Sequence, residues 1–133
     1  MSHSISISFH AAQGTTAGLG VTNGRTLVAD RPDHEAIGFD GPQLLAAAIG
    51  GCFWNHLHSV AENSGVRLNI DDVDVEITLA GKPPRIVRAH GWVALSGAHE
   101  ADLAKVFDGA VETSTVANSI TAAIPVSFER RTV

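Results

Sequence analysis

The chain has 133 residues, 44% of them hydrophobic, which is enough for one domain over 1–133 with its own core. The net charge is −5 and the nine lysines and arginines are scattered, so nucleic acid is not an expected partner. One cysteine excludes an intrachain disulfide. The N-terminus lacks the pattern of a signal peptide, and no apolar stretch approaches the roughly 20 residues that span a bilayer. We therefore predict a cytoplasmic protein with no membrane partner.

The low charge content points to a covered surface. Charged residues make up only 17% of the chain, which is at the low end for a soluble monomer. A chain of this size with so few charges is expected to bury part of its surface against a partner.

Short strands are expected in the first 30 residues. Ile5, Ile7 and Phe9 alternate with polar residues, which is typical of a half-buried strand. The pair Asn23-Gly24 favours a tight hairpin, because both positions accept a positive φ. We therefore predict strands at 4–10, 15–22 and 25–30, followed by a polar loop at 31–41.

A long helix follows the loop. Pro42 suits a first helical turn, and apolar residues keep a helical spacing until Gly65, which is expected as the C-terminal cap. The segment 44–54 is apolar nearly all round, so both sides should be covered. Gly50 and Gly51 should each lower the stability of the helix by about 1 kcal/mol relative to alanine. We expect the close approach of another backbone to compensate for this loss.

In the second half of the chain, apolar and polar residues again alternate as they do in strands. Val73, Val75, Ile77 and Leu79 share one face of a strand, and a short Gly-Pro turn should join it to the next strand as an antiparallel hairpin. The predicted elements are strands at 68–80 and 85–96, a helix at 99–113, a short turn at 115–120 and a final strand at 122–130. The order β-β-β-α-β-β-α-β indicates an α+β fold rather than a doubly wound sheet.

Cys52, the single cysteine, lies in the middle of the predicted helix. A buried cysteine is most often a small inert hydrophobe. Because the thiolate is the nucleophile, a reactive cysteine needs a nearby cation or histidine. His56 lies four residues on, on the same helical face, where it could reach the sulfur or serve as a core or interface histidine.

Metal binding is not expected. Cys52 and His56 supply two ligands where structural zinc needs four. His56 and His58 point in nearly opposite directions on a helix, so they cannot share one ion. His34 is interpreted as a solvated loop residue. No cofactor and no metal site are predicted.

The run GPQLLAAAIGGCF, from Gly41 to Phe53, resembles the central helix of the OsmC/Ohr family, the osmotically inducible protein C and organic hydroperoxide resistance proteins. In that family a Pro-Glu-x-Leu start leads to a cysteine preceded by small residues. The tail STVANSI, residues 114–120, is similar to the family's Cys-Pro-Val-Ser-Asn-x-Leu segment, and the order of strands and helices is also similar. The resemblance implies an OsmC-like fold with antiparallel sheets around a buried central helix. It also implies an intertwined homodimer with the cysteine helices inside.

The resemblance further implies roles for individual residues. Active members are thiol peroxidases for organic hydroperoxides, with a peroxidatic cysteine, a resolving cysteine and an Arg-Glu pair that activates the thiolate. Cys52 occupies the peroxidatic position. Ser114 stands where the resolving cysteine would be, and Gln43 stands where the glutamate would be.

The sequence does not select which arginine would form the activating pair. Arg25 or Arg31 could supply it, and no local motif selects between them. Glu35 could replace the lost carboxylate if its loop folds back. Without a resolving cysteine, a sulfenic acid at Cys52 would need an external thiol, or it would over-oxidise.

Three functions remain open. The first is a one-cysteine, thiol-dependent reductase of organic hydroperoxides. The second is a non-catalytic dimer that binds a small hydrophobic ligand near Cys52. The third is a stress-related scaffold without small-molecule chemistry. The side chains expected to line a ligand pocket are His56, Phe53, Trp54, Trp92 and Phe107, although aromatic residues are more often plain core.

Overall fold

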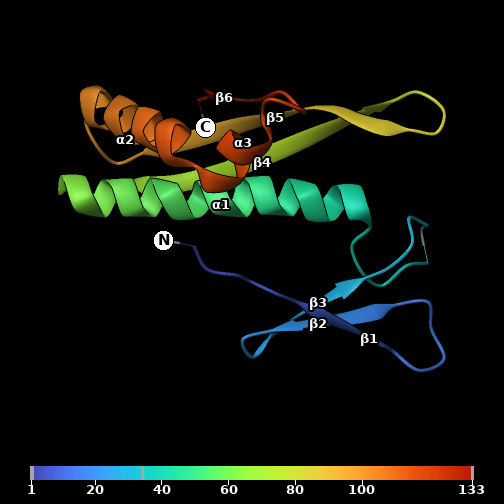
Figure 1. The fold of residues 1–133 in the computed structure, drawn as a ribbon. Helices are drawn as coiled ribbons and strands as arrows, with labels where there is room; N and C mark the ends of the chain where they lie inside the picture. The colour runs from blue at the N-terminus through green and yellow to red at the C-terminus, as the bar shows by residue number, and fades with distance from the viewer. Residues whose placement is uncertain (1, 34, 133) are drawn as a thin grey trace. The chain divides into compact units, whose positions relative to one another are not determined.

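The computed structural model describes residues 2–33 and 35–132, so His34 lies outside the described residues. The chain forms two compact units, Met1–Leu44 and Leu45–Val133, and each is described by itself (Figure 1). The long helix α1 (Gly41–Ser64) begins in the first unit and continues through the second.

The first unit contains an antiparallel sheet in the order β1-β2-β3. Its strands are β1 (Ser8–Ala11), β2 (Gly18–Thr22) and β3 (Arg25–Ala29). The predicted hairpin is confirmed, because Asn23 and Gly24 join β2 to β3 with φ of 45° and 74°. The first strand begins later than predicted. Ser8 pairs with Val21 near the end of β2, so residues before it have almost no partner strand left.

The second unit contains a three-stranded sheet in the order β4-β5-β6, with its helices α1, α2 and α3. Its further elements are β4 (Asn69–Ala80), β5 (Arg85–Ser96), α2 (Glu100–Thr113), α3 (Thr115–Ile120) and β6 (Val126–Arg130). The predicted hairpin is present as β4 and β5, and the predicted turn at 115–120 is the helix α3. The mixed α+β fold with two sheets is confirmed.

The expectation of purely antiparallel sheets is wrong for one pair of strands, because β5 and β6 are parallel. Two-residue hairpins can join only antiparallel neighbours, whereas parallel neighbours need a long crossover. Here α2 and α3 form that crossover and return the chain to the end of the sheet from which β5 started. The strand β6 is therefore added at the edge beside β5, in the same direction.

The core of the second unit lies between the helices and one face of this sheet. Figure 1 shows α1 running along β4 and β5 with α2 beside it. Phe53 is fully buried and stacks on Phe128 of β6, with ring centroids 3.9 Å apart. Phe107 of α2 meets the same ring edge-on at 5.9 Å. The buried members of this cluster are Phe53, Leu57, Ala61, Val93, Leu95, Leu103, Val106 and Ala110.

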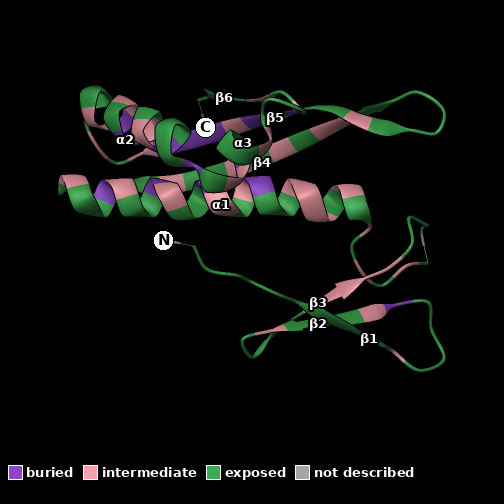
Figure 2. Ribbon diagram, viewed as in Figure 1, coloured by how far each residue is buried: buried purple, intermediate pink, exposed green. Residues whose placement is uncertain are grey.

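Within the second unit only one face of α1 is covered, so the expected cover on its other side stays a prediction. Ile49, Phe53, Leu57 and Ala61, spaced by four residues, are buried, and the opposite face is exposed (Figure 2). Trp54 on that face is 40% exposed. No helix among the described residues combines the length and hydropathy needed to cross a membrane.

The two adjacent glycines of α1 differ in their surroundings. A Cβ on Gly50 would lie 3.1 Å from Cγ2 of Val75 in β4, so the close neighbour is a side chain rather than the backbone that the sequence suggested. A Cβ on Gly51 would meet nothing within 4 Å. Gly50 is therefore explained by packing inside the chain, and Gly51 is not.

Candidate functional site

The structure brings Cys52 and Ser114 together from positions 62 residues apart. Cys52 lies on α1 and is partly exposed, whereas Ser114 lies between α2 and α3 and is fully buried. The Ser114 hydroxyl donates to the Cys52 sulfur at 3.9 Å. Such a distance is long for a hydrogen bond, and sulfur is a weak acceptor. Two of the three positions that the family resemblance singled out therefore lie side by side.

The backbone of Ser114 explains why its hydroxyl is available. The residue ends α2 and also precedes α3, with φ −60° and ψ 107°. A serine before a helix usually accepts a hydrogen bond from a backbone N–H of the first turn. Ser114 makes no such side-chain cap. Its hydroxyl is directed at the Cys52 sulfur instead, and among residues 2–33 and 35–132 it has no other side-chain partner.

A close helix crossing holds Ser114 against α1. Gly109 of α2 faces Val60 of α1, and a Cβ on Gly109 would lie only 2.7 Å from Val60 Cγ1. The absence of a side chain at Gly109 therefore allows the two helices to approach, and the last turn of α2 reaches Cys52 and His56.

His56 is engaged by two threonines. Its Nδ1 lies 3.1 Å from Thr113 Oγ1, and its Nε2 lies 3.4 Å from Thr115 Oγ1. The Thr113 hydroxyl donates its proton to the Gly109 carbonyl at 2.8 Å, so this oxygen must accept from Nδ1–H. In the neutral ring, Nε2 then accepts from Thr115. This arrangement favours a satisfied histidine that positions the residues on both sides of Ser114, rather than a partner of the sulfur.

These two threonines are not among the site residues predicted from the sequence. Their signal was present, since both flank Ser114 in the tripeptide Thr113-Ser114-Thr115, but only the fold brings this tripeptide beside His56.

The aromatic candidates separate into two environments. Phe53 is fully buried in the packed core, and the partly buried Phe107 packs against it, so both rings are engaged in core packing. Trp54 lies on the exposed face of α1, with its ring 5.5 Å from that of His58. Trp92 lies on the sheet and meets His90 at 4.7 Å. Of the four, only Trp54 is exposed on the helix that carries Cys52.

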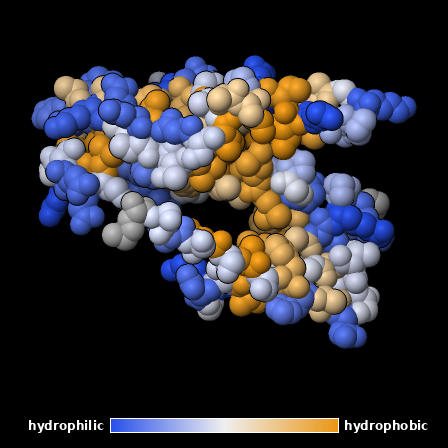
Figure 3. All heavy atoms as spheres, viewed as in Figure 1, coloured by the Kyte–Doolittle hydropathy of each residue, from blue (hydrophilic) through white to orange (hydrophobic). Residues whose placement is uncertain are grey.

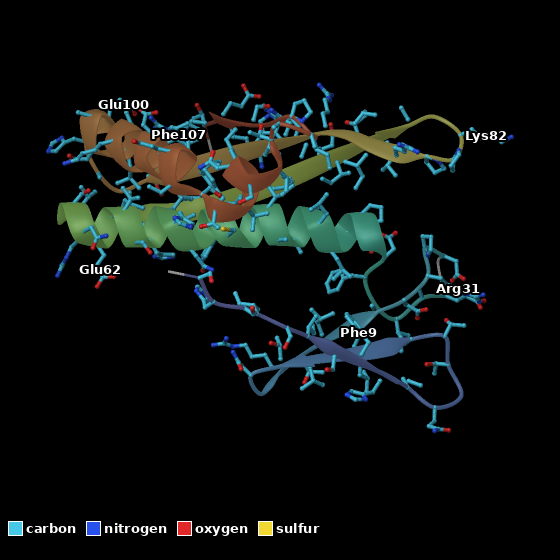
Figure 4. All side chains as sticks on the ribbon, in the orientation of Figure 1. Phe9, Arg31, Glu62, Lys82, Glu100 and Phe107 are labelled. Carbon is cyan, nitrogen blue, oxygen red and sulfur yellow. The ribbon has the colours of Figure 1, made fainter. Side chains whose placement is uncertain are left out.

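The remaining candidates, Arg25, Arg31, Glu35 and Gln43, belong to the first unit. Arg31 and Gln43 line the same hollow of 340 Å³, whereas Arg25 is an exposed residue of β3. Arg31, labelled in Figure 4, pairs through Nε with Asp33 Oδ2 at 2.7 Å. Of the two arginines, Arg31 is therefore the one near Gln43.

Gln43 has a structural partner of its own. Its Oε1 accepts from the Asp40 N–H at 2.9 Å, while Asp40 Oδ1 accepts from the Gln43 N–H at 2.9 Å. This reciprocal pair is a capping box at the start of α1. The spacing of Asp40 and Gln43 was a readable signal for it.

Asp30 organises the loop that carries Arg31 and Glu35. Its carboxylate accepts from the Thr16 hydroxyl at 2.6 Å and from the backbone N–H groups of Arg31 and Ile37. These bonds, the Thr16 hydroxyl first, lower the pKa of Asp30. The Glu35 backbone N–H donates to Asp33 Oδ1 at 2.9 Å, which is a local turn, and Glu35 itself is exposed.

An ion pair that the sequence analysis missed joins α2 to β6. Arg130 donates from both Nη atoms to the two carboxylate oxygens of Glu100, which lies at the start of α2 (Figure 4). The hydrogen bond from Arg130 lowers the pKa of Glu100, and the same bond raises the pKa of Arg130. Because 30 residues separate the two charges, the sequence carried no local signal of this pair.

Among residues 2–33 and 35–132, no group of three histidine, cysteine or acidic side chains could hold a metal ion.

Solved structures share this fold over nearly the whole chain. The OsmC-like protein from Mycoplasma pneumoniae is 14% identical with a TM-score of 0.79, and the alignment covers 100% of this chain and 99% of that one. The organic hydroperoxide resistance protein OhrB of Bacillus subtilis is 15% identical with a TM-score of 0.71 and coverages of 97% and 98%. An organic hydroperoxide resistance protein OsmC from Legionella pneumophila is 18% identical with a TM-score of 0.70, covering 96% of each chain. At these identities the likeness establishes the fold.

No curated protein sequence matches the chain. The family model described as OsmC-like protein matches residues 32–129, which include α1, Cys52 and Ser114. The chain therefore belongs to the OsmC-like protein family.

Proposed function

We propose that this OsmC-like protein is a one-cysteine peroxidase, which reduces organic hydroperoxides at Cys52 with the help of an external thiol. The observation that carries the proposal is the buried Ser114 hydroxyl directed at the partly exposed Cys52 sulfur. Two proteins of the same fold are named for organic hydroperoxide resistance.

The chemistry needs only one protein thiol. Attack of the Cys52 thiolate on the outer peroxide oxygen breaks the O–O bond, leaving a sulfenic acid and an alkoxide that takes up a proton as the alcohol. An external thiol then attacks the sulfenic sulfur, forming a mixed disulfide and releasing water. A second external thiol displaces Cys52, so two thiols are oxidised for each hydroperoxide reduced.

The residue at position 114 determines how the oxidised Cys52 is reduced again at the end of the catalytic cycle. A cysteine at this position would face the sulfur and supply the resolving thiol, but a hydroxyl cannot form a disulfide. Its O–H donates to the sulfur, and in the oxidised protein it would lie beside the sulfenic group. The resolving step therefore falls to a molecule from outside.

Arg31 is the arginine that we propose to support the thiolate. It shares a hollow with Gln43, the residue at the position of the family's glutamate. The Gln43 amide oxygen is occupied by the capping box, so Asp33 rather than Gln43 holds the guanidinium.

We also propose that the protein works as a homodimer. Hydrophobic residues lie at the surface of each unit (Figure 3). The exposed large hydrophobic side chains include Ile5, Ile7, Phe9, Leu19, Val21, Trp54 and Val111. A second copy that covers the exposed face of α1 would account for Gly51, for the exposure of Trp54 and for the low charge content.

The test is hydroperoxide consumption with an external dithiol. We expect the protein to consume cumene hydroperoxide, and Cys52→Ser to abolish this consumption. Ser114→Ala keeps the thiol and removes the hydroxyl, so it should retain turnover at a changed rate. Arg31→Ala should slow the reaction, and Arg25→Ala is its matched control. Consumption by the wild type no faster than by Cys52→Ser would rule out the peroxidase.

A second function is favoured by the exposed Trp54 on the helix of Cys52. In this alternative the dimer binds a small hydrophobic ligand without turning it over. Such a ligand raises the midpoint of thermal unfolding further as its concentration rises, with a logarithmic dependence above the dissociation constant, because it binds only the native state. A panel of hydrophobic acids that stabilises both the wild type and Cys52→Ser, without peroxide turnover, would favour this function.

A further inference from the structure

A second group of reactive side chains lies on the face of the β4-β5-β6 sheet that the helices leave uncovered. His90 of β5 pairs in register with Ser127 of the parallel strand β6, and Glu129 follows two residues later on the same face. His90 Nδ1 lies 2.6 Å from Ser127 Oγ, and His90 Nε2 lies 2.9 Å from Glu129 Oε1. The three side chains form one continuous hydrogen-bonded chain.

In the hydrogen-bonded series Ser127-His90-Glu129, the chemistry of the three side chains fixes which atom donates each proton. The Glu129 carboxylate can only accept, so His90 Nε2 must carry a proton and donate it. In the neutral ring Nδ1 is then an acceptor, and the Ser127 hydroxyl donates to it. A hydroxyl that donates to a histidine, which is itself oriented by a carboxylate, is the arrangement of an activated serine nucleophile.

The neighbours of His90 keep the ring in this orientation. Its side chain is 22% exposed and meets the Trp92 ring edge-on, with centroids 4.7 Å apart. Glu76 of β4 is its partner on the other side. Ser127 is exposed, so the nucleophile is accessible while the base is mostly enclosed.

The backbone beside Ser127 offers a donor for a developing negative charge. Arg131 N donates to Val93 O on the β5 side of β6. Because successive residues of a strand direct their N–H groups to opposite sides, the Ser127 N–H also points toward β5, and that of Phe128 points to the outer edge. The N–H after a serine nucleophile is a common oxyanion donor in enzymes of this chemistry.

We propose that Ser127, His90 and Glu129 form a hydrolytic site for small neutral esters. The Ser127 oxygen attacks the ester carbonyl carbon while its proton moves to His90 Nδ1. The tetrahedral intermediate expels the alcohol, which takes that proton, and leaves an acyl group on Ser127. Water, deprotonated by His90, releases the acid and restores the serine. Glu76 and Glu129 place two carboxylates next to His90, whereas Arg88 on the same face of β5 is held by the Thr78 hydroxyl, so the charge nearest to His90 disfavours anionic esters.

The test uses the full chain carrying Cys52→Ser, so that the thiol cannot react with the ester. We expect this protein to hydrolyse p-nitrophenyl acetate and to carry an acetyl group on Ser127 in peptide mass spectra. Ser127→Ala and His90→Gln should each lower the rate by at least about tenfold, because a general base typically contributes a factor of 10² to 10⁴. Glu129→Gln keeps an acceptor for Nε2 but removes the charge. Its rate of ester hydrolysis should therefore lie between the rates of those two variants and the rate of the parent protein.

The matched control is Ser59→Ala, which removes a hydroxyl that donates only to the Asn55 carbonyl at 3.1 Å. It should hydrolyse the ester at the parent rate. Thermal unfolding of each variant shows whether it is folded, and Ser127→Thr provides a second variant that keeps the hydroxyl. Hydrolysis that survives both Ser127→Ala and His90→Gln, or acetylation found only on lysines, would overturn the proposal. Since every protein in the series lacks the thiol, neither result depends on the peroxidase proposal.

Discussion

Replacing Gly109 by alanine should loosen the crossing of α1 and α2, and with it the contact between Ser114 and Cys52. The new Cβ would lie 2.7 Å from Val60 Cγ1 and 3.3 Å from Val60 Cγ2, closer than packed carbons approach. Overpacking of this kind costs about 1 to 3 kcal/mol. The gain in helix propensity from glycine to alanine offsets about 1 kcal/mol of it. We therefore expect a net loss of about 0 to 2 kcal/mol in the free energy of unfolding.

A double-mutant cycle separates the destabilisation caused by the steric clash with Val60 from the stabilisation caused by the higher helix propensity of alanine. Val60→Ala removes both methyl groups that the new Cβ would meet, so the combination Gly109→Ala with Val60→Ala should be more stable than the sum of the single changes predicts. Contacting residues show coupling energies of about 0.5 to 3 kcal/mol. The measurement is urea unfolding at fixed protein concentration, followed by tryptophan fluorescence.

Gly41→Ala is the control for propensity, because a Cβ there would meet nothing within 4 Å. It should leave the protein as stable as the wild type or slightly more so. Two results would refute the reasoning: a Gly109→Ala protein that gains the same stability as Gly41→Ala, or additive changes in the cycle with Val60→Ala.

The remaining predictions concern charge, capping and association. Arg130 lowers the pKa of Glu100, so the stabilisation from this pair is present above the unfolded value of about 4.3 and is lost as the pH falls through the lower folded value. The difference in unfolding midpoint between the wild type and Glu100→Gln should therefore shrink in acid. Asp40→Ala should cost about 1 kcal/mol by removing the cap of α1, as measured by urea unfolding. Gly51→Ala should weaken self-association in sedimentation if two copies pack on this face, and an unchanged dimer would argue against that contact.

The periodic elements of the fold could be predicted from the sequence because their signals are local. Alternation predicted β4 and β5, and helical spacing predicted α1 and α2, each within one or two residues. The direction of β6 could not be predicted, since alternation is the same in parallel and antiparallel strands. It depends on where the α2-α3 crossover returns the chain, which is a property of the packed unit.

The candidate site was predictable only in part. The family resemblance selected Cys52 and Ser114, but the direction of the Ser114 hydroxyl depends on a helix-ending backbone that has no sequence signal of its own. The partners of His56 depend on the helix crossing at Gly109, and Thr113 lies 57 residues from His56 in the sequence. Arg31 could be preferred to Arg25 only once the loop had folded around Asp30.

The geometry of Ser114 limits what can happen to an oxidised Cys52. The hydroxyl is buried and does not cap α3, so its position favours a role toward the sulfur over a role in helix stability. It can hydrogen-bond to a sulfenic acid but cannot reduce one. Cys52 itself is partly exposed, on a helix whose outer face is uncovered within the second unit. Under the proposed function, the reductant and the hydroperoxide reach the sulfur through its exposed part, because the buried Ser114 occupies the other side. A second copy packed on α1 would then control access to the thiol as well as complete the fold.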